Sequence, residues 1–196
     1  MEGLEKRISS RREMHIFWLL KSSSTMRSNI QEVSELVDKS TSMMRKSPKT
    51  GFMHVLVRVL KFATKPEWLV ARPTPLAEFE WKGDLTCDGG PEGLGEALAM
   101  VAAEINNFDV GVRHAAPPIL VLVTDGGYPR HNFESSLQHL LATRLGRHVR
   151  RVAVLVGRDD VRPEGLESLT DFVGKDGPPL LRGYMAANAL AQYILA

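Results

Sequence analysis

Three polar segments of the sequence hold side chains that could bind a cation or take part in hydrolysis: residues 21–26, 84–93 and 124–127. The first offers the hydroxyls of Ser23 and Thr25, the second is glycine-rich and includes Glu92, and the third carries the carboxylate of Asp125. Oxygen ligands from separate loops suit magnesium, which requires near-octahedral coordination by carboxylates, hydroxyls and water. A hydroxyl and a carboxylate are also two parts of a hydrolase site.

The signatures of other catalytic sites are incomplete. No Gly-x-Ser-x-Gly elbow surrounds the serines, and the glycine-rich segment lacks the Lys-Ser/Thr ending of a phosphate-binding loop. No pair of histidines has the spacing of zinc ligands, and Cys87 is a lone thiol. We therefore expect a protein that is not an enzyme. The alternatives are a hydrolase that uses Asp125 with Ser23 and a dyad of Lys21 with Ser23.

The elements that must position these segments are indicated by the apolar pattern. Four apolar runs of strand length occur at residues 15–20, 53–60, 119–123 and 152–156. Near-continuous apolar runs are typical of strands that are covered on both faces, as in a parallel sheet. Helical periodicity separates them, at residues 30–44, 94–105, 133–141, 163–173 and 187–194. Ser28 and Gln31 have the spacing of a capping box at the start of the first of these helices.

The order of elements predicts an α/β fold: a doubly wound, mostly parallel central sheet with helices on both faces. Residues 52–70 hold two strand candidates without a helix between them, which predicts one antiparallel edge strand. Ligands of such sheets bind beyond the carboxyl ends of the strands. If the strands at 15–20 and 119–123 are neighbours, Ser23 and Asp125 lie on the same rim.

Length and composition indicate the domain organisation and the classes of partner that the protein could bind. The 196 residues predict a polar extension at 1–13 and a single domain at 14–196. Residues 1–72 carry a net charge of +7 and residues 73–196 one of −5, but no nucleic-acid-binding motif accompanies the basic part. The single cysteine and the absence of an apolar run long enough to span a bilayer predict a soluble, cytoplasmic protein without disulfides. We expect no nucleic-acid or membrane partner.

The three segments together resemble a known family. An apolar strand followed by Ser-x-Thr-Met, a glycine-rich loop that enters Leu-Gly-Glu-Ala-Leu, and Leu-Val-Thr-Asp-Gly look like a von Willebrand factor A (vWA) domain, which has a Rossmann-like fold. The sequence around residues 17–20, 57–62 and 117–126 is similar to that of the stand-alone bacterial TerY-like group, which is associated with tellurium resistance. The resemblance covers about residues 14–195.

The resemblance implies a metal-ion-dependent adhesion site in which one ligand position is changed. Ser23 and Thr25 match its two hydroxyls, and Asp125 matches its third-loop carboxylate. Lys21 stands where the family has an Asp, and its ammonium group has no lone pair for a cation. The second-loop Thr falls at Pro91 or Glu92, and neither supplies a hydroxyl.

The replaced residue predicts a degenerate site with no metal ligand set, hence no cofactor. A magnesium site rebuilt with Glu92 beside Ser23, Thr25 and Asp125 is the alternative. Two arrangements of Lys21 are open: it pairs with Asp125 and contacts Ser23 or Thr25 as an internal substitute cation, or it extends into solvent and leaves Asp125 hydrated.

The predicted function is therefore that of a non-catalytic protein–protein interaction module. It would bind its partner on the rim formed by residues 21–25, 89–93 and 125–130. The TerY-like resemblance implies a bacterial stress or signalling system whose members include a protein kinase and a PP2C-type phosphatase. The rival interpretations are a metal-dependent vWA binding domain and, last, the hydrolase.

Overall fold

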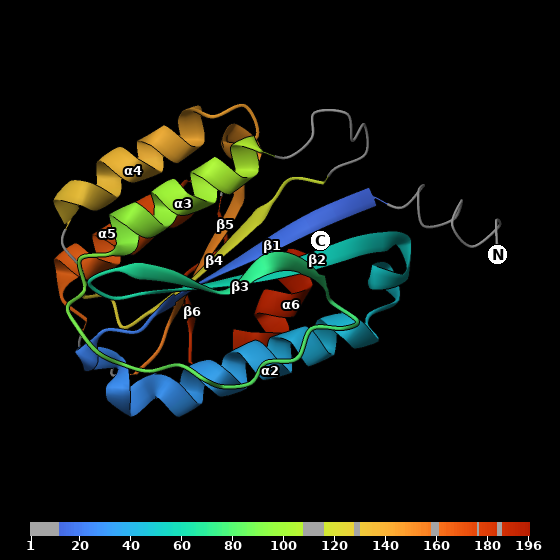
Figure 1. The fold of residues 1–196 in the computed structure, drawn as a ribbon, viewed down its shortest axis with the longest axis horizontal. Helices are drawn as coiled ribbons and strands as arrows, with labels where there is room; N and C mark the ends of the chain where they lie inside the picture. Colours follow the sequence, from blue (N-terminus) through green and yellow to red (C-terminus); the bar gives the residue numbers. More distant parts are fainter. Residues whose placement is uncertain (1–11, 108–115, 128–129, 158–160, 176, 184–185) are drawn as a thin grey trace.

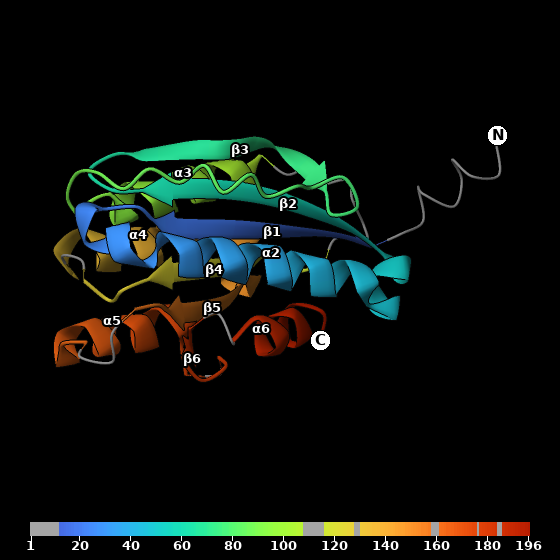
Figure 2. The same ribbon diagram turned by 90° about the horizontal axis from the view of Figure 1, so that it is seen from below.

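The computed structural model describes residues 12–107, 116–127, 130–157, 161–175, 177–183 and 186–196. Its centre is a six-stranded sheet of β1 (Arg12–Lys21), β2 (Met53–Phe62), β3 (Pro66–Pro75), β4 (Ile119–Thr124), β5 (Arg150–Leu155) and β6 (Leu181–Arg182). The strands lie in the order β3-β2-β1-β4-β5-β6, which Figure 2 shows from below. Every neighbouring pair is parallel except β2 and β3, so the predicted α/β fold with one antiparallel edge strand is confirmed.

Five α-helices of the described residues cover the two faces of the sheet. They are α2 (Ile30–Lys46), α3 (Leu94–Asn106), α4 (Arg130–Ala142), α5 (Pro163–Val173) and α6 (Ala187–Ile194). Helices α3, α4 and α5 lie on one face, and α2 and α6 lie on the other (Figure 1). The layers are those of a doubly wound sheet with helices on both faces.

The middle of the central strand β1, residues 16–20, is continuously apolar because both faces of the strand are buried there. Its side chains alternate between two cores: Phe17 and Leu19 pack on the side of α3 to α5, whereas Ile16, Trp18 and Leu20 pack on the side of α2 and α6. All five are fully buried. A strand whose successive side chains point to opposite, equally covered faces has no polar alternation, which explains the unbroken run in the sequence.

Some ends of the elements differ from the sequence prediction. Strand β1 begins at Arg12, so it includes two residues that were expected in the polar extension. The predicted capping box at Ser28 and Gln31 is wrong: a 3-10 helix, η1 (Ser24–Asn29), precedes α2, and the cap position at Asn29 has no side-chain cap. Because the chain is already helical at Ser28, its hydroxyl donates instead to Oδ1 of Asn29 at 3.2 Å.

A long connection between β3 and α3, residues 76–93, crosses the α2 side of the molecule. Leu76, Phe79 and Leu85 are buried in the core on that side, and the Arg45 guanidinium of α2 donates to the Phe79 carbonyl oxygen at 2.8 Å. Figure 1 shows this segment running past α2. It returns the glycine-rich residues 89–93 to the carboxyl ends of β1 and β2, where the site described below is formed.

Candidate functional site

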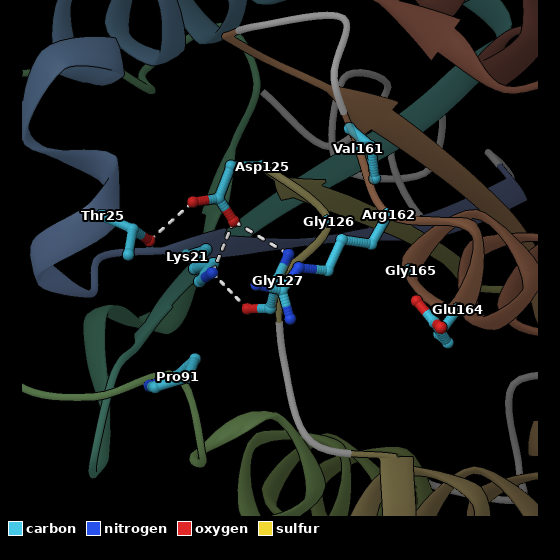
Figure 3. Close-up of a pocket in the computed structure, with 10 residues that line it drawn as sticks. All are labelled: Lys21, Thr25, Pro91, Asp125, Gly126, Gly127, Val161, Arg162, Glu164 and Gly165. Carbon is cyan, nitrogen blue, oxygen red and sulfur yellow. Dashed lines mark hydrogen bonds and ion pairs between the residues drawn. The ribbon is translucent and has the colours of Figure 1, made fainter.

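The carboxyl ends of β1 and β4 bring the first and third polar segments together. The two strands are parallel neighbours, and Leu20 is paired with Val123. Lys21 is the last residue of β1, and Asp125 is the first residue after β4. Both therefore leave the sheet at the same edge, as Figure 3 shows. The predicted adjacency of these strands is confirmed.

The Lys21 side chain lies inside the protein and is only 1% exposed. Its Nζ donates to Oδ1 of Asp125 at 2.5 Å and also to the carbonyl oxygen of Gly127. The ion pair expected from the sequence is thus formed, and the solvent-extended arrangement of Lys21 is wrong. The second acceptor differs from the prediction, because the ammonium contacts a main-chain carbonyl rather than Ser23 or Thr25.

Further hydrogen bonds fix both oxygens of the Asp125 carboxylate. The Thr25 hydroxyl donates to Oδ2 at 2.6 Å, and the Gly127 amide donates to Oδ1 at 3.1 Å. Ser23 is buried and lies one hydrogen bond further away, with its Oγ 3.0 Å from Oγ1 of Thr25. A polar network therefore occupies the rim. It consists of Lys21, the Asp125 carboxylate, the hydroxyls of Thr25 and Ser23, and the main chain of Gly127.

Burial and pairing act in opposite directions on the two charged groups. Burial lowers the pKa of Lys21, while the hydrogen bond and the charge of Asp125 raise it; the net shift is downward. Burial raises the pKa of Asp125, but hydrogen bonds from Lys21 and Thr25 and the charge of Lys21 outweigh it and hold that pKa below its usual value. Asp125 is therefore ionised at neutral pH.

A divalent cation does not fit these residues. Asp125 supplies the carboxylate of the polar network, and both of its oxygens already accept hydrogen bonds. The Lys21 ammonium donates only, and its charge would repel a cation held by Asp125. Within the described ranges, no group of three or more His, Cys, Asp or Glu residues is placed to hold a metal ion.

Glu92 and Pro91 occupy different places at the rim. Pro91 lines the pocket beside Lys21, where it offers no ligand oxygen from its side chain. Glu92 is exposed and lines a separate hollow together with Thr64 and Ser135. Neither residue therefore brings a side-chain oxygen to the Lys21–Asp125 pair, which argues against the magnesium site rebuilt with Glu92.

The pocket above the pair has a volume of about 620 Å³ and extends to the start of α5. Arg162 and Glu164, at the start of α5, also line it (Figure 3). These two residues are not among those that the sequence predicts for the site. A signal was present, because a proline-initiated helix that follows β5 must begin at the carboxyl edge of the sheet.

Close main-chain packing holds the Asp125 turn against α5. Gly126 has a φ of +84°, a conformation that favours glycine, and a Cβ atom on Gly165 would lie 2.4 Å from the Gly126 carbonyl oxygen. Both glycines are therefore needed for this approach. The turn that presents Asp125 and the helix start that presents Arg162 form one packed unit.

Main-chain hydrogen bonds also join the loops that surround the network. They run from Asp88 N to Ser22 O (3.0 Å), from Ser24 N to Gly89 O (3.1 Å) and from Gly93 N to Ala63 O (2.7 Å). The approach at Gly93 is so close that a Cβ atom there would lie 2.2 Å from the Ala63 carbonyl oxygen. The segments 21–25 and 89–93 of the predicted rim are thus joined by their main chains. Residues 128–129 of the predicted rim lie outside the described residues.

Comparison with solved structures relates this architecture to known proteins. The chain is similar to a von Willebrand factor type A structure from Catenulispora acidiphila, with a TM-score of 0.64, 15% identity and 94% of the chain covered. The chain spans 42% of the length of that structure. The fold is a von Willebrand factor A fold. No protein-family model matches the sequence, and no curated protein sequence matches it significantly.

Two further structures match over nearly their whole length. BatB from Bacteroides thetaiotaomicron has a TM-score of 0.62 and 15% identity, with 92% of this chain and 97% of that chain covered. An aerotolerance-related membrane protein from Bacteroides fragilis has a TM-score of 0.58 and 16% identity, with 92% and 98% covered. In the described part of the chain, no helix is long and apolar enough to cross a membrane.

Proposed function

We propose that this vWA-type domain is a non-catalytic interaction module that binds a protein partner on its strand-end rim without a metal ion. The observation that carries the proposal is the position of Lys21, whose buried ammonium binds Asp125 and the Gly127 carbonyl. In a metal-ion-dependent adhesion site, a cation would balance the third-loop carboxylate. Here a side chain of the protein balances it, so the site is a degenerate one with a built-in charge.

The surroundings of the pair support a binding surface. The pocket next to it is open to solvent, and its walls combine the apolar Val161 and Pro91 with the exposed charges of Arg162 and Glu164. Interfaces commonly combine an apolar centre with a polar rim that sets orientation. The partner contact would therefore involve exposed groups around the network, while Lys21 and Asp125 hold the loops in place.

The resemblance of the three motif segments to the TerY-like group supports a role in a bacterial stress or signalling system, in the cytoplasm. Its partners would be a protein kinase and a PP2C-type phosphatase.

The hydrolase alternative has weaker support. Ser23 is fully buried, and its hydroxyl lies against Thr25 rather than against a free base. Asp125 is engaged by Lys21 and Thr25, so it is poorly placed to accept a proton from a nucleophile. A screen of ester and phosphate substrates addresses this alternative directly, because hydrolysis that disappears in Asp125→Asn would contradict a non-catalytic role.

Affinity capture tests the interaction role. The immobilised protein is exposed to a lysate of its native cells, once with EDTA and once with millimolar magnesium, and captured proteins are identified by mass spectrometry. The expected result is the same specific set of partners in both buffers, including a kinase or a PP2C-type phosphatase. Capture that requires magnesium would contradict a metal-free rim.

A pair of variants locates the binding surface. Arg162→Glu reverses a charge at the edge of the pocket and leaves the Lys21–Asp125 pair intact. Lys175→Glu makes the same change at an exposed position just beyond the other end of α5. We expect Arg162→Glu to weaken capture and Lys175→Glu to leave it unchanged. Equal effects of the two variants would place the binding surface elsewhere.

A further inference from the structure

A second surface lies at the opposite end of the sheet from the rim. Helix α2 ends at Lys46, the 3-10 helix η2 (Pro48–Phe52) follows, and β2 begins at Met53. These residues are at the amino ends of the parallel strands, because Arg12, the first residue of β1, is paired with Met53. We name the group of Arg45, Lys46, Lys49 and Phe52 the basic corner.

The basic corner contains an unusually exposed aromatic side chain. Phe52 is 78% exposed, and Met43, on the last turns of α2, is 38% exposed. Within the described residues, these two are the exposed large hydrophobic side chains. Single exposed apolar residues are common on protein surfaces, but two of them within ten residues and among cations mark a candidate contact surface.

The cations of the basic corner are not paired with a carboxylate of the described residues. Other lysines on this part of the chain form ion pairs, Lys39 with Glu35 at 3.1 Å and Lys61 with Glu67 at 3.0 Å. Arg45, Lys46 and Lys49 form no ion pair with any of the described residues. The sequence has no acidic residue between Asp38 and Glu67, so this stretch of chain supplies no carboxylate to pair with them.

A small hollow adjoins the basic corner. Its volume is about 160 Å³, and Arg45, Thr50 and His54 line it together with the apolar side chains of Met53, Val55 and Leu76. A recess of this size accommodates one apolar side chain of a ligand. Because Arg45 lines this recess, an apolar group that enters it would bring neighbouring carboxylates close to its guanidinium.

We propose that the basic corner binds an acidic segment of a partner protein, with one apolar side chain in the hollow and carboxylates on Arg45, Lys46 and Lys49. This surface is separate from the rim and does not depend on the function proposed there. A recess fits a protruding side chain better than it fits a lipid surface, and polybasic membrane sites generally use four to eight cations. Residues 1–11 hold three basic and two acidic residues, so the N-terminal segment of this chain lacks the complementary charge.

Two synthetic peptides test the proposal by fluorescence anisotropy. One is the fluorescein-labelled peptide Asp-Glu-Asp-Glu-Leu-Asp-Glu-Asp-Glu, and the other has Ser in place of its Leu. We expect the leucine peptide to bind at least fivefold more tightly and to lose affinity when salt is raised from 50 to 300 mM. Equal affinity of the two peptides would overturn the role of the hollow and with it the proposal.

Charge-reversal variants place the binding on the surface. The double variant Lys46→Glu/Lys49→Glu changes two exposed residues of the basic corner, and Lys82→Glu/Lys175→Glu changes two exposed lysines elsewhere. The expected result is at least a tenfold loss of peptide affinity in the first and less than a twofold change in the second. A similar loss in both would show nonspecific attraction and overturn the proposal. Binding to phosphatidylserine vesicles without binding to the leucine peptide would replace it with a membrane surface.

Discussion

Replacement of Lys21 by Met tests whether the internal cation holds the rim together. Methionine has a flexible, unbranched side chain similar in length to the lysine stem, so the change removes the charge and leaves little cavity. Asp125, whose side chain is 19% exposed, would keep its bonds from Thr25 and Gly127 but lose its counter-charge. The Gly127 carbonyl would lose the ammonium donor as well.

The expected loss of stability follows from these contacts. Removal of one partner from a buried ion pair destabilises a protein by about 3–5 kcal/mol, since the other charge is left unpaired. The loss should be smaller than the upper end of this range because Asp125 is partly exposed and keeps two hydrogen bonds. The Gly127 carbonyl, which loses its donor, adds to the loss. We expect about 3 kcal/mol. For a domain of this size, that corresponds to a fall in Tm of roughly 6–12 °C.

Thermal and urea unfolding followed by circular dichroism measures the effect, and the chain offers a matched control. Lys61 lies beside Leu20 in the register of β1 and β2 and pairs with Glu67, whose side chain is 65% exposed. Because exposed ion pairs contribute only about 0–1 kcal/mol, Lys61→Met should lower Tm by no more than a few degrees. If Lys21→Met melts like the parent or like Lys61→Met, the stabilising role of the internal cation is refuted.

A double-mutant cycle separates the pair from the rest of the site. Lys21→Met combined with Asp125→Leu removes both charges, so the stability lost in Lys21→Met should be partly recovered. A double variant that is destabilised by the simple sum of the two single changes would show that the residues act independently.

Three further changes have defined outcomes. Lys21→Asp should be less stable than the parent in EDTA and should gain Tm with millimolar magnesium, while the parent does not respond. The folded pKa of Asp125 lies below its ordinary value, so the ionised carboxylate contributes fully to folding stability above about pH 4. This stability is lost as the pH falls through the lowered pKa. The difference in unfolding free energy between the parent and Asp125→Asn should therefore shrink between pH 6 and pH 3. Gly93→Ala should lower stability by about 2 kcal/mol or more because its Cβ atom meets the Ala63 carbonyl, whereas Gly51→Ala, which meets nothing within 4 Å, should be nearly neutral in denaturant unfolding.

The arrangement of the sheet could be predicted from the sequence for a clear physical reason, whereas the Lys21–Asp125 pair was one of two arrangements that the sequence left open. Two buried parallel strands that end in Lys21 and Thr124 place the following residues at one edge, and a carboxylate there requires a partner. The polar type and the position of these residues therefore make the contact possible, and the structure shows that it forms. The same reasoning correctly placed the antiparallel edge, because no helix fits between β2 and β3.

Other parts of the site depend on contacts that residue types do not reveal. The Gly127 carbonyl accepts from Lys21 because of the path of a turn, and main-chain atoms carry no sequence signal. Arg162 reaches the pocket because α5 packs closely on the Asp125 turn, which depends on glycines far apart in the sequence. Glu92 was a candidate ligand only through the family resemblance, and in the folded loop it lines a different hollow.

The hydrogen bonds that join the loops at 22–24, 63 and 88–93 affect how quickly a partner can bind. A surface whose backbone is already tied in place loses little conformational entropy when it is covered, and binding need not wait for a loop to close. We expect association near the ordinary range of about 10⁵–10⁷ M⁻¹s⁻¹, with differences between partners expressed mainly in their rates of dissociation. Since a lysine supplies the balancing charge, the readiness of this surface would not follow changes in the magnesium concentration of the cell.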